Sequence, residues 1–174
     1  MRAQAKRIAM ITRRLFLFAF VTVMPTTAWA MDEIRLNALK VAYVYNFTKF
    51  IEWQERPAGG FRICLNTENQ ALIREFEKIE KKGPRVIVLN DDKDAPTQWN
   101  DCQIIYLETP LELPENSTRS FDNTLLVSEM KSEDAQIYFV LINNKLRFSI
   151  GKDRAEKAGL SISSKLLRLA HEIY

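Results

Sequence analysis

Four short segments of almost continuous apolar residues dominate the middle of the chain and constrain its fold more than any other feature. They lie at residues 61–66, 85–90, 102–108 and 124–129, and a helical pattern at 68–82 separates the first two. Strands that are apolar along their whole length are typical of parallel sheets covered on both faces. The sequence therefore predicts an α/β fold: a single layered domain with a mainly parallel central sheet and helices on both faces.

The last third of the chain carries a different pattern. Two apolar segments, 137–142 and 146–150, flank the triplet Asn143-Asn144-Lys145. Asparagine tolerates the positive φ angles of a tight turn, so we expect a β-hairpin here. After the hairpin we expect a short helix capped by Asp153 and a last helix over 163–173 that begins with a serine cap. The domain is thus predicted to end in a hairpin plus helix.

The first thirty residues differ in character from the rest. Residues 1–30 contain five basic residues and no acidic one, an apolar run at 15–23 and the small-residue pattern Ala28-Trp29-Ala30. These features are typical of a cleaved secretory signal peptide, and the apolar run is too short to remain as a membrane-spanning helix. We therefore expect residues 1–30 to be removed and residues 31–174 to work as one domain in the periplasm.

Removal of this segment changes the charge of the chain. The full sequence has 25 Lys plus Arg and 22 Asp plus Glu, and loss of the five basic residues leaves 20 basic against 22 acidic residues. The remaining cations are interspersed with acids, whereas binding to a phosphate backbone needs clustered Lys and Arg, so nucleic acid is not an expected partner. No later segment approaches 18 consecutive apolar residues, so we expect no direct membrane span after cleavage.

An amphipathic helix is expected at the start of the mature domain, capped by Asp32 and continuing to about Trp53. Its apolar residues share one stripe: Leu36, Leu39, Tyr43, Phe47, Phe50 and Ile51. Val41 and Tyr45 project nearly opposite this stripe, so we predict them to be solvent-facing and to form a candidate partner surface. The alternative is that they are ordinary scattered surface residues, or that another helix covers them.

Sequence motifs of catalysis and cofactor binding are missing. A dinucleotide-binding fold would place G-x-G-x-x-G after the first strand, but residues 65–69 contain no glycine, and no P-loop occurs. His171 is the single histidine and has no nucleophile motif beside it. We therefore expect no catalytic residue, no metal site and no cofactor, and we predict that the chain is not an enzyme.

The chain has two cysteines, Cys64 in the first predicted strand and Cys102 at the start of the third. In an oxidising compartment two thiols in a domain of this size favour pairing, and neighbouring strands would bring their Cα atoms within the 4.4–6.8 Å that a disulfide needs. The alternative is two buried thiols that pack as small apolar residues. We favour a Cys64–Cys102 disulfide; a redox-catalytic pair is not expected, because C-x-x-C spacing is absent.

Several segments of the mature chain are familiar from a known family. They are ALKVAYVYNFTKFIEW at 38–53, RICL at 62–65, DCQIIY at 101–106, LRFSI at 146–150 and AEKAGLSISSKLLRLA at 155–170. In content and order they resemble the YfiR family of periplasmic proteins. The resemblance implies a layered α/β domain, often a homodimer, that is not an enzyme. It also implies that Cys64 and Cys102 correspond to a redox-relevant pair of the family.

Characterised members of the YfiR family inhibit an inner-membrane diguanylate cyclase by binding its periplasmic part. The resemblance thus implies repression of cyclic-di-GMP signalling and of biofilm formation, through protein–protein interaction. A second hypothesis is a periplasmic small-ligand-binding protein, since open parallel sheets bind ligands outside the carboxyl ends of their strands. Here those ends lie near Asn66, Asn90 and Glu108.

Overall fold

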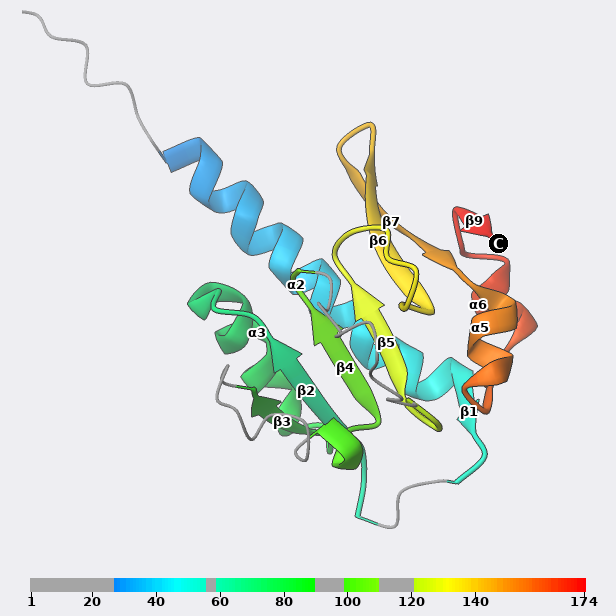
Figure 1. Cartoon of the computed structure of the whole chain (residues 1–174). Coiled ribbons are helices and arrows are strands. Elements are labelled where there is room, and N and C mark those ends of the chain that lie inside the picture. Colours follow the sequence, from blue (N-terminus) through cyan, green and yellow to red (C-terminus); the bar gives the residue numbers. More distant parts are fainter. Residues whose placement is uncertain (1–26, 56–58, 90–98, 110–120) are drawn as a thin grey trace, which may run out of the picture. The chain divides into compact units, whose positions relative to one another are not determined.

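The computed structural model describes residues 27–55, 59–89, 99–109 and 121–174 (Figure 1). The chain divides into two compact units, Met1–Asp32 and Glu33–Tyr174. The first unit is represented only by the first residues of a helix, and the rest of the predicted signal peptide lies outside the described residues. Apart from the first residues of that helix, all features below belong to the second unit.

A seven-stranded sheet forms the centre of this unit. Its order is β3 (Arg85–Val88), β2 (Arg62–Asn66), β4 (Ile104–Leu107), β5 (Leu125–Ser128), β6 (Ile137–Ile142), β7 (Lys145–Ile150) and β9 (Glu172–Ile173). The pairs from β3 to β6 are all parallel, whereas β7 runs antiparallel to β6. The predicted α/β fold with a mainly parallel sheet is therefore confirmed.

The central strands are apolar throughout because both of their faces are covered. In β4, Ile104 and Tyr106 point into one cluster of buried side chains, whereas Ile105 and Leu107 point into another on the opposite face. All four residues are buried. This two-sided burial explains why the segment shows no alternation of polar and apolar residues.

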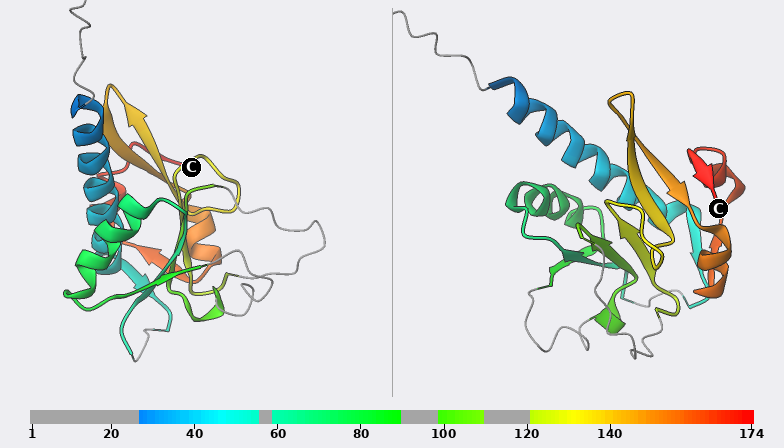
Figure 2. Two further views of the ribbon diagram at one scale, coloured as in Figure 1. Left: turned by 90° about the vertical axis from the view of Figure 1, so that its left-hand side faces the viewer. Right: turned by 45° about the horizontal axis from the view of Figure 1, so that its top comes forward.

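Two long helices cover one face of the sheet. These are α2 (Thr27–Phe50) and α3 (Gln70–Glu80), which lie on the same side of the sheet in the left view of Figure 2. Val44 and Phe47 of α2 pack in one cluster with Phe76 of α3, and all three side chains are fully buried. Asn69 begins α3 by accepting hydrogen bonds from the first-turn amides of Ala71 and Leu72.

The opposite face has a smaller cover. The short 3₁₀ helix η1 (Trp99–Asp101) packs there, and its cluster of buried residues comprises Cys64, Leu89, Trp99, Cys102, Ile105, Leu107, Leu126 and Ala135. The helical cover of the sheet is thus unequal in the part of the chain that the structure describes.

The predicted first helix is wrong at both ends. Asp32 lies inside α2 and is not its cap, and α2 ends at Phe50. The next residues form β1 (Ile51–Trp53), which pairs antiparallel with β8 (Leu160–Ile162). Ile51 and Trp53 are buried on either side of exposed Glu52, a strand-like alternation that a partner distant in sequence stabilises.

The predicted hairpin is confirmed, with Asn143 and Asn144 at φ angles of 50° and 58°. The helices after it differ from the prediction. Gly151, rather than Asp153, is the N-cap of α5 (Lys152–Lys157), and α6 (Ser164–Leu167) is a single turn. The predicted last helix does not reach Ile173 because the backbone joins β7 as strand β9 instead.

Candidate functional site

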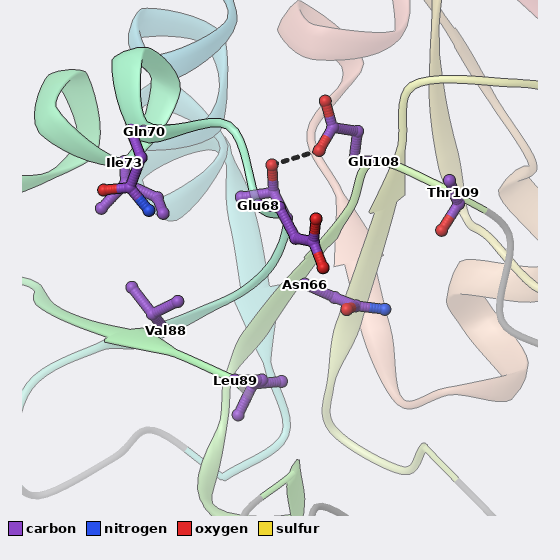
Figure 3. Close-up of a pocket in the computed structure, with 9 residues that line it drawn as sticks. Asn66, Glu68, Gln70, Ile73, Val88, Leu89, Glu108 and Thr109 are labelled. Atoms are coloured by element: carbon purple, nitrogen blue, oxygen red, sulfur yellow. Dashed lines mark hydrogen bonds between the residues drawn. The ribbon is translucent and has the colours of Figure 1, made fainter. Parts of the chain in front are cut away.

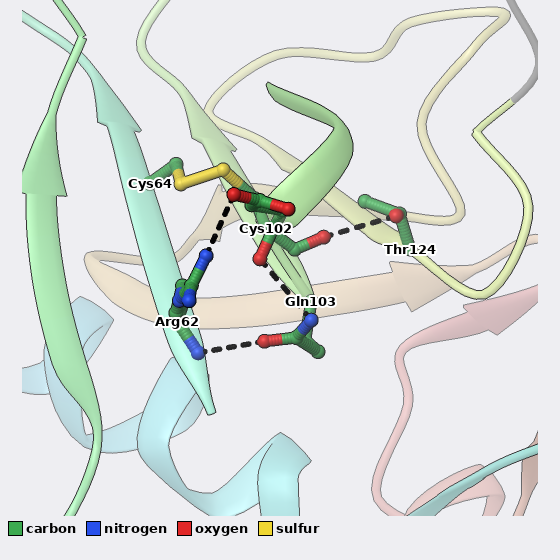
Figure 4. The surroundings of a disulfide bond; sticks show 6 residues. Arg62, Cys64, Cys102, Gln103 and Thr124 are labelled. Carbon is green, nitrogen blue, oxygen red and sulfur yellow. Dashed lines mark hydrogen bonds and ion pairs between the residues drawn. A yellow bond between two sulfur atoms is a disulfide. The ribbon is translucent and has the colours of Figure 1, made fainter. Parts of the chain in front are cut away.

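The predicted disulfide is present. Cys64 and Cys102 are bonded, with their Cα atoms 5.9 Å apart, and both are buried (Figure 4). Around them the Thr124 hydroxyl donates to the carbonyl of Cys102 at 3.0 Å, and the backbone N–H of Arg62 donates to the side chain of Gln103 at 2.9 Å. A buried disulfide supported in this way reacts slowly with external thiols, so its geometry favours a structural role.

A groove runs between α2 and α3 and contains both residues of the predicted partner surface. Its volume is about 410 Å³, and we call it the α2–α3 groove. It is lined by Ala38, Val41, Ala42, Tyr45, Asn46, Lys49, Glu75, Lys78, Ile79 and Lys82. The solvent exposure expected for Val41 is wrong, because α3 covers it and only 4% of its surface is exposed. Tyr45 is half-buried at the wall of the groove.

The charges of the groove are mostly positive. The ammonium groups of Lys49 and Lys82 lie 4.2 and 5.3 Å from the centre of the Tyr45 ring, close enough for cation–π attraction. Lys78 forms an ion pair with Glu75 one turn earlier in α3, and its side chain remains 66% exposed. The groove therefore combines an apolar floor with exposed ammonium groups at its rim.

A buried polar network ties α2 to the sheet, and sequence reasoning missed it. Lys40 of α2 donates to the Glu129 carboxylate at 2.7 Å, and the Tyr106 hydroxyl donates to the same carboxylate oxygen. Burial, and then the negative charge of Glu129, raises the pKa of Tyr106 above its usual value near 10. Asn37 lies one turn from Lys40 and is also buried. The sequence holds one indication of this network. Asn37, Lys40 and Val44 are spaced by three and four residues, so they share one face of the helix, and that face differs from the predicted apolar stripe.

A second concave site lies at the carboxyl edge of the sheet (Figure 3). Its volume is about 760 Å³, and its lining comprises Asn66, Thr67, Glu68, Gln70, Ile73, Val88, Leu89, Glu108 and Thr109. Asn66 and Glu108 are thus together, as the small-ligand hypothesis predicts, whereas Asn90 lies outside the described residues. We call this site the carboxyl-edge cavity.

The topology explains where this cavity forms. From β2 the chain passes through α3 to β3 on one side, while β4 adds to the other side of β2. Ligands of open α/β sheets bind at such a switch point. The cavity is negatively charged, with Glu68 and Glu108 in its lining. The Thr67 hydroxyl donates to the Glu108 carboxylate and accepts from the backbone N–H of Asn69 at 3.0 Å. Polar groups in and beside the cavity lining are thus hydrogen-bonded to each other.

The single histidine, His171, lies at the surface. It is exposed and lies in the connection between α6 and β9, where its backbone N–H donates to the carbonyl of Phe148 at 2.8 Å. Across the described residues, no group of three His, Cys, Asp or Glu side chains has the arrangement of a metal site. No helix within these ranges is both long and apolar enough to cross a bilayer.

Comparison with known proteins identifies the family of the chain. No curated protein matches the sequence. The family model described as YfiR/HmsC-like matches residues 37–171. These include α2 from Asn37 onward, every strand of the seven-stranded sheet except β9, both cysteines and the residues of both concave sites. A match over this length shows membership, and the chain therefore belongs to the YfiR/HmsC-like family.

Proposed function

We propose that this protein is a periplasmic regulator that binds the periplasmic part of an inner-membrane diguanylate cyclase and represses it. Repression lowers cyclic-di-GMP and restrains biofilm formation. The observation that carries the proposal is the family match over residues 37–171, nearly the whole of the predicted mature domain. Members of this family are regulatory rather than catalytic, and the proposal accordingly assigns the chain no reaction of its own.

The α2–α3 groove supports this function as the surface for the partner. Regulation by contact requires an accessible patch with an apolar anchor and surrounding polar groups. Tyr45 supplies an aromatic side chain at the wall, and Val41 supplies part of the buried floor. In this proposal Val41 shapes the surface from below and Tyr45 touches the partner. Homodimerisation remains a prediction from the family resemblance.

Deletion of the gene and measurement of cellular cyclic-di-GMP tests the proposal. We expect the level to rise, and to return when the full-length chain is supplied again. A chain without residues 2–30 is the matched control, because it carries the same domain without the predicted export signal. It should fail to restore the level. An unchanged cyclic-di-GMP level in the deletion strain would contradict the proposed function.

Binding of a small ligand is a second candidate function, favoured by the carboxyl-edge cavity at the switch point of the sheet. Its two glutamates and its apolar wall of Ile73, Val88 and Leu89 suit a small cationic or hydroxylated compound rather than an anion. Calorimetric titration with a panel of amines and polyols, repeated on Glu108→Gln, tests this function. Heat that is equal in both proteins would contradict a site at Glu108.

A further inference from the structure

The exposed side of α2 carries small and apolar residues at helical spacing. Ile34, Ala38 and Ala42 follow each other at intervals of four residues and lie on one face with Tyr45. Ala38 and Ala42 are exposed, and Ile34 is 53% exposed. Since alanine leaves room above the helix backbone, this face allows another segment to approach closely between α2 and α3.

The charges that border this face are predominantly basic. Among the ten residues that line the α2–α3 groove, three are lysines and one, Glu75, is acidic. Glu75 already forms an ion pair with Lys78. Lys49 of α2 and Lys82 of the turn after α3 converge on the Tyr45 ring, which concentrates positive charge at one end of the groove. Such a surface attracts carboxylates and repels cations.

This charge pattern disfavours a second copy of the chain in the groove. A two-fold symmetric dimer brings the same patch of both subunits together. Antiparallel packing of two α2 helices would place exposed Arg35 of one subunit near the Lys49 end of the other, because both residues flank the same face. Like charges in contact would oppose that assembly, whereas an acidic partner neutralises them.

We infer that the α2–α3 groove binds an acidic amphipathic segment of a partner protein. Apolar side chains of that segment pack over Ala38, Ala42 and Tyr45, and its carboxylates pair with Lys49 and Lys82. The inference depends on the proposed function in one respect only: it takes the periplasmic part of the cyclase as the protein that carries the segment. The expected binding of an acidic segment follows from the residues of the groove and does not depend on which protein carries that segment.

The direct test uses the exported, processed protein purified from the periplasm and two synthetic helical peptides. Both peptides carry the same Leu and Ala face, but one is flanked by Glu and the other by Lys. We expect the Glu peptide to bind, to shift the amide resonances of Ala38, Ala42 and Lys49, and to bind more weakly in 1 M salt, where exposed charges are screened. The Lys peptide should not bind.

Charge-reversal variants sharpen this test. Lys49→Glu with Lys82→Glu should weaken binding of the Glu peptide by about tenfold or more, since two favourable pairs become repulsive. The matched control is Lys131→Glu with Lys145→Glu, two exposed lysines outside the groove, which makes the same change in net charge. The control should bind like the wild type.

Several results would overturn the inference. They are equal binding of both peptides, no binding at millimolar peptide, and resonance shifts confined to the carboxyl-edge cavity. A wild-type dimer that Ala42→Arg dissociates would assign the groove to a second copy. Binding to phosphatidylglycerol vesicles that only the groove reversal abolishes, with peptide binding unaffected, would assign it to a lipid surface. Failure of the proposed function can be distinguished from failure of this inference. If only the proposed function fails, the Glu peptide still binds the groove, but deletion of the gene leaves the cyclic-di-GMP level unchanged.

Discussion

The two faces of the central sheet are stabilised by different interactions. On one face α2 and α3 build a large apolar cluster with β2, β4, β5, β6 and β7, in which rings such as Phe47 and Phe148 meet edge to face at 5.4 Å. On the other face a smaller cluster surrounds the Cys64–Cys102 disulfide. The first face also carries the α2–α3 groove, the proposed partner surface.

The disulfide lies on the face that has the smaller apolar cluster. Two long helices bury enough apolar surface to stabilise one face by packing alone. The second face has only short elements among the described residues, so a crosslink that limits the unfolded chain contributes proportionally more there. The proposed partner binding on the helical face and the crosslink on the other face should then be independent, and the following variants test that independence.

Phe47→Ala should have the largest effect, because it removes a fully buried ring from the helical face. We expect the free energy of unfolding to fall by about 3–5 kcal/mol, the usual cost of such a cavity. Urea denaturation of the oxidised protein measures it. Leu39→Ala on the same helix is the control, because Leu39 is 45% exposed and should cost less than about 1 kcal/mol. Equal losses of stability in the two variants would contradict the placement of Phe47 in the core and of Leu39 at the surface.

Loss of the disulfide should have the next largest effect. Cys64→Ala with Cys102→Ala opens a loop of 38 residues, for which the chain-entropy model gives about 3–4 kcal/mol. Urea denaturation with and without reductant measures it, and reductant should not affect the variant. Binding of the Glu peptide to the groove should be unchanged in the folded variant. Loss of that binding would show that the two faces are coupled.

Tyr106→Phe should have a smaller effect, and one that depends on pH. Near pH 7 it removes a hydrogen bond to the Glu129 carboxylate and should cost about 1.5–3 kcal/mol. Because the pKa of Tyr106 is raised in the folded protein, its contribution to stability is complete below pH ~10 and is lost as the unfolded chain ionises above it, at about 1.4 kcal/mol per pH unit. Denaturation between pH 9 and ~11 should therefore show a steeper decline for the wild type. Parallel declines would contradict this.

Tyr45→Asp should have the smallest effect on stability. Tyr45 is half-buried at the edge of the large apolar cluster, and two ammonium groups lie over its ring, so we expect the free energy of unfolding to change by about 1 kcal/mol or less. Binding of the acidic segment should weaken, because the aromatic wall is lost and a negative charge is added. Thermal unfolding followed by circular dichroism checks the first expectation. A collapse in stability would instead place Tyr45 in the core.

The parts of the fold that depend on local pattern could be predicted from the sequence. The parallel strands follow from runs such as residues 104–107, and the hairpin turn follows from Asn143 and Asn144. The end of α2 could not be predicted in this way. Residues 51–53 form a strand instead of continuing the helix because a strand more than 100 positions later pairs with them. The sequence around residues 51–53 does not indicate this distant partner.

The same limit applies to the candidate site. The pairing of Cys64 and Cys102 was inferable from the compartment and from the strand positions. The sequence wrongly predicts an exposed Val41, because the pattern of a helix considered alone indicates only one buried face. In the structure α3 packs beside α2 and buries Val41, while Leu39 of the predicted stripe stays exposed. The groove exists only through this packing of two helices.

The most direct test of the account is the cyclic-di-GMP level of the deletion strain supplied with three versions of the chain. Wild type and the Lys131→Glu, Lys145→Glu control should both restore the low level. Lys49→Glu with Lys82→Glu, exported and folded to the same extent, should leave the level high. Full restoration by this groove variant would contradict repression through the α2–α3 groove.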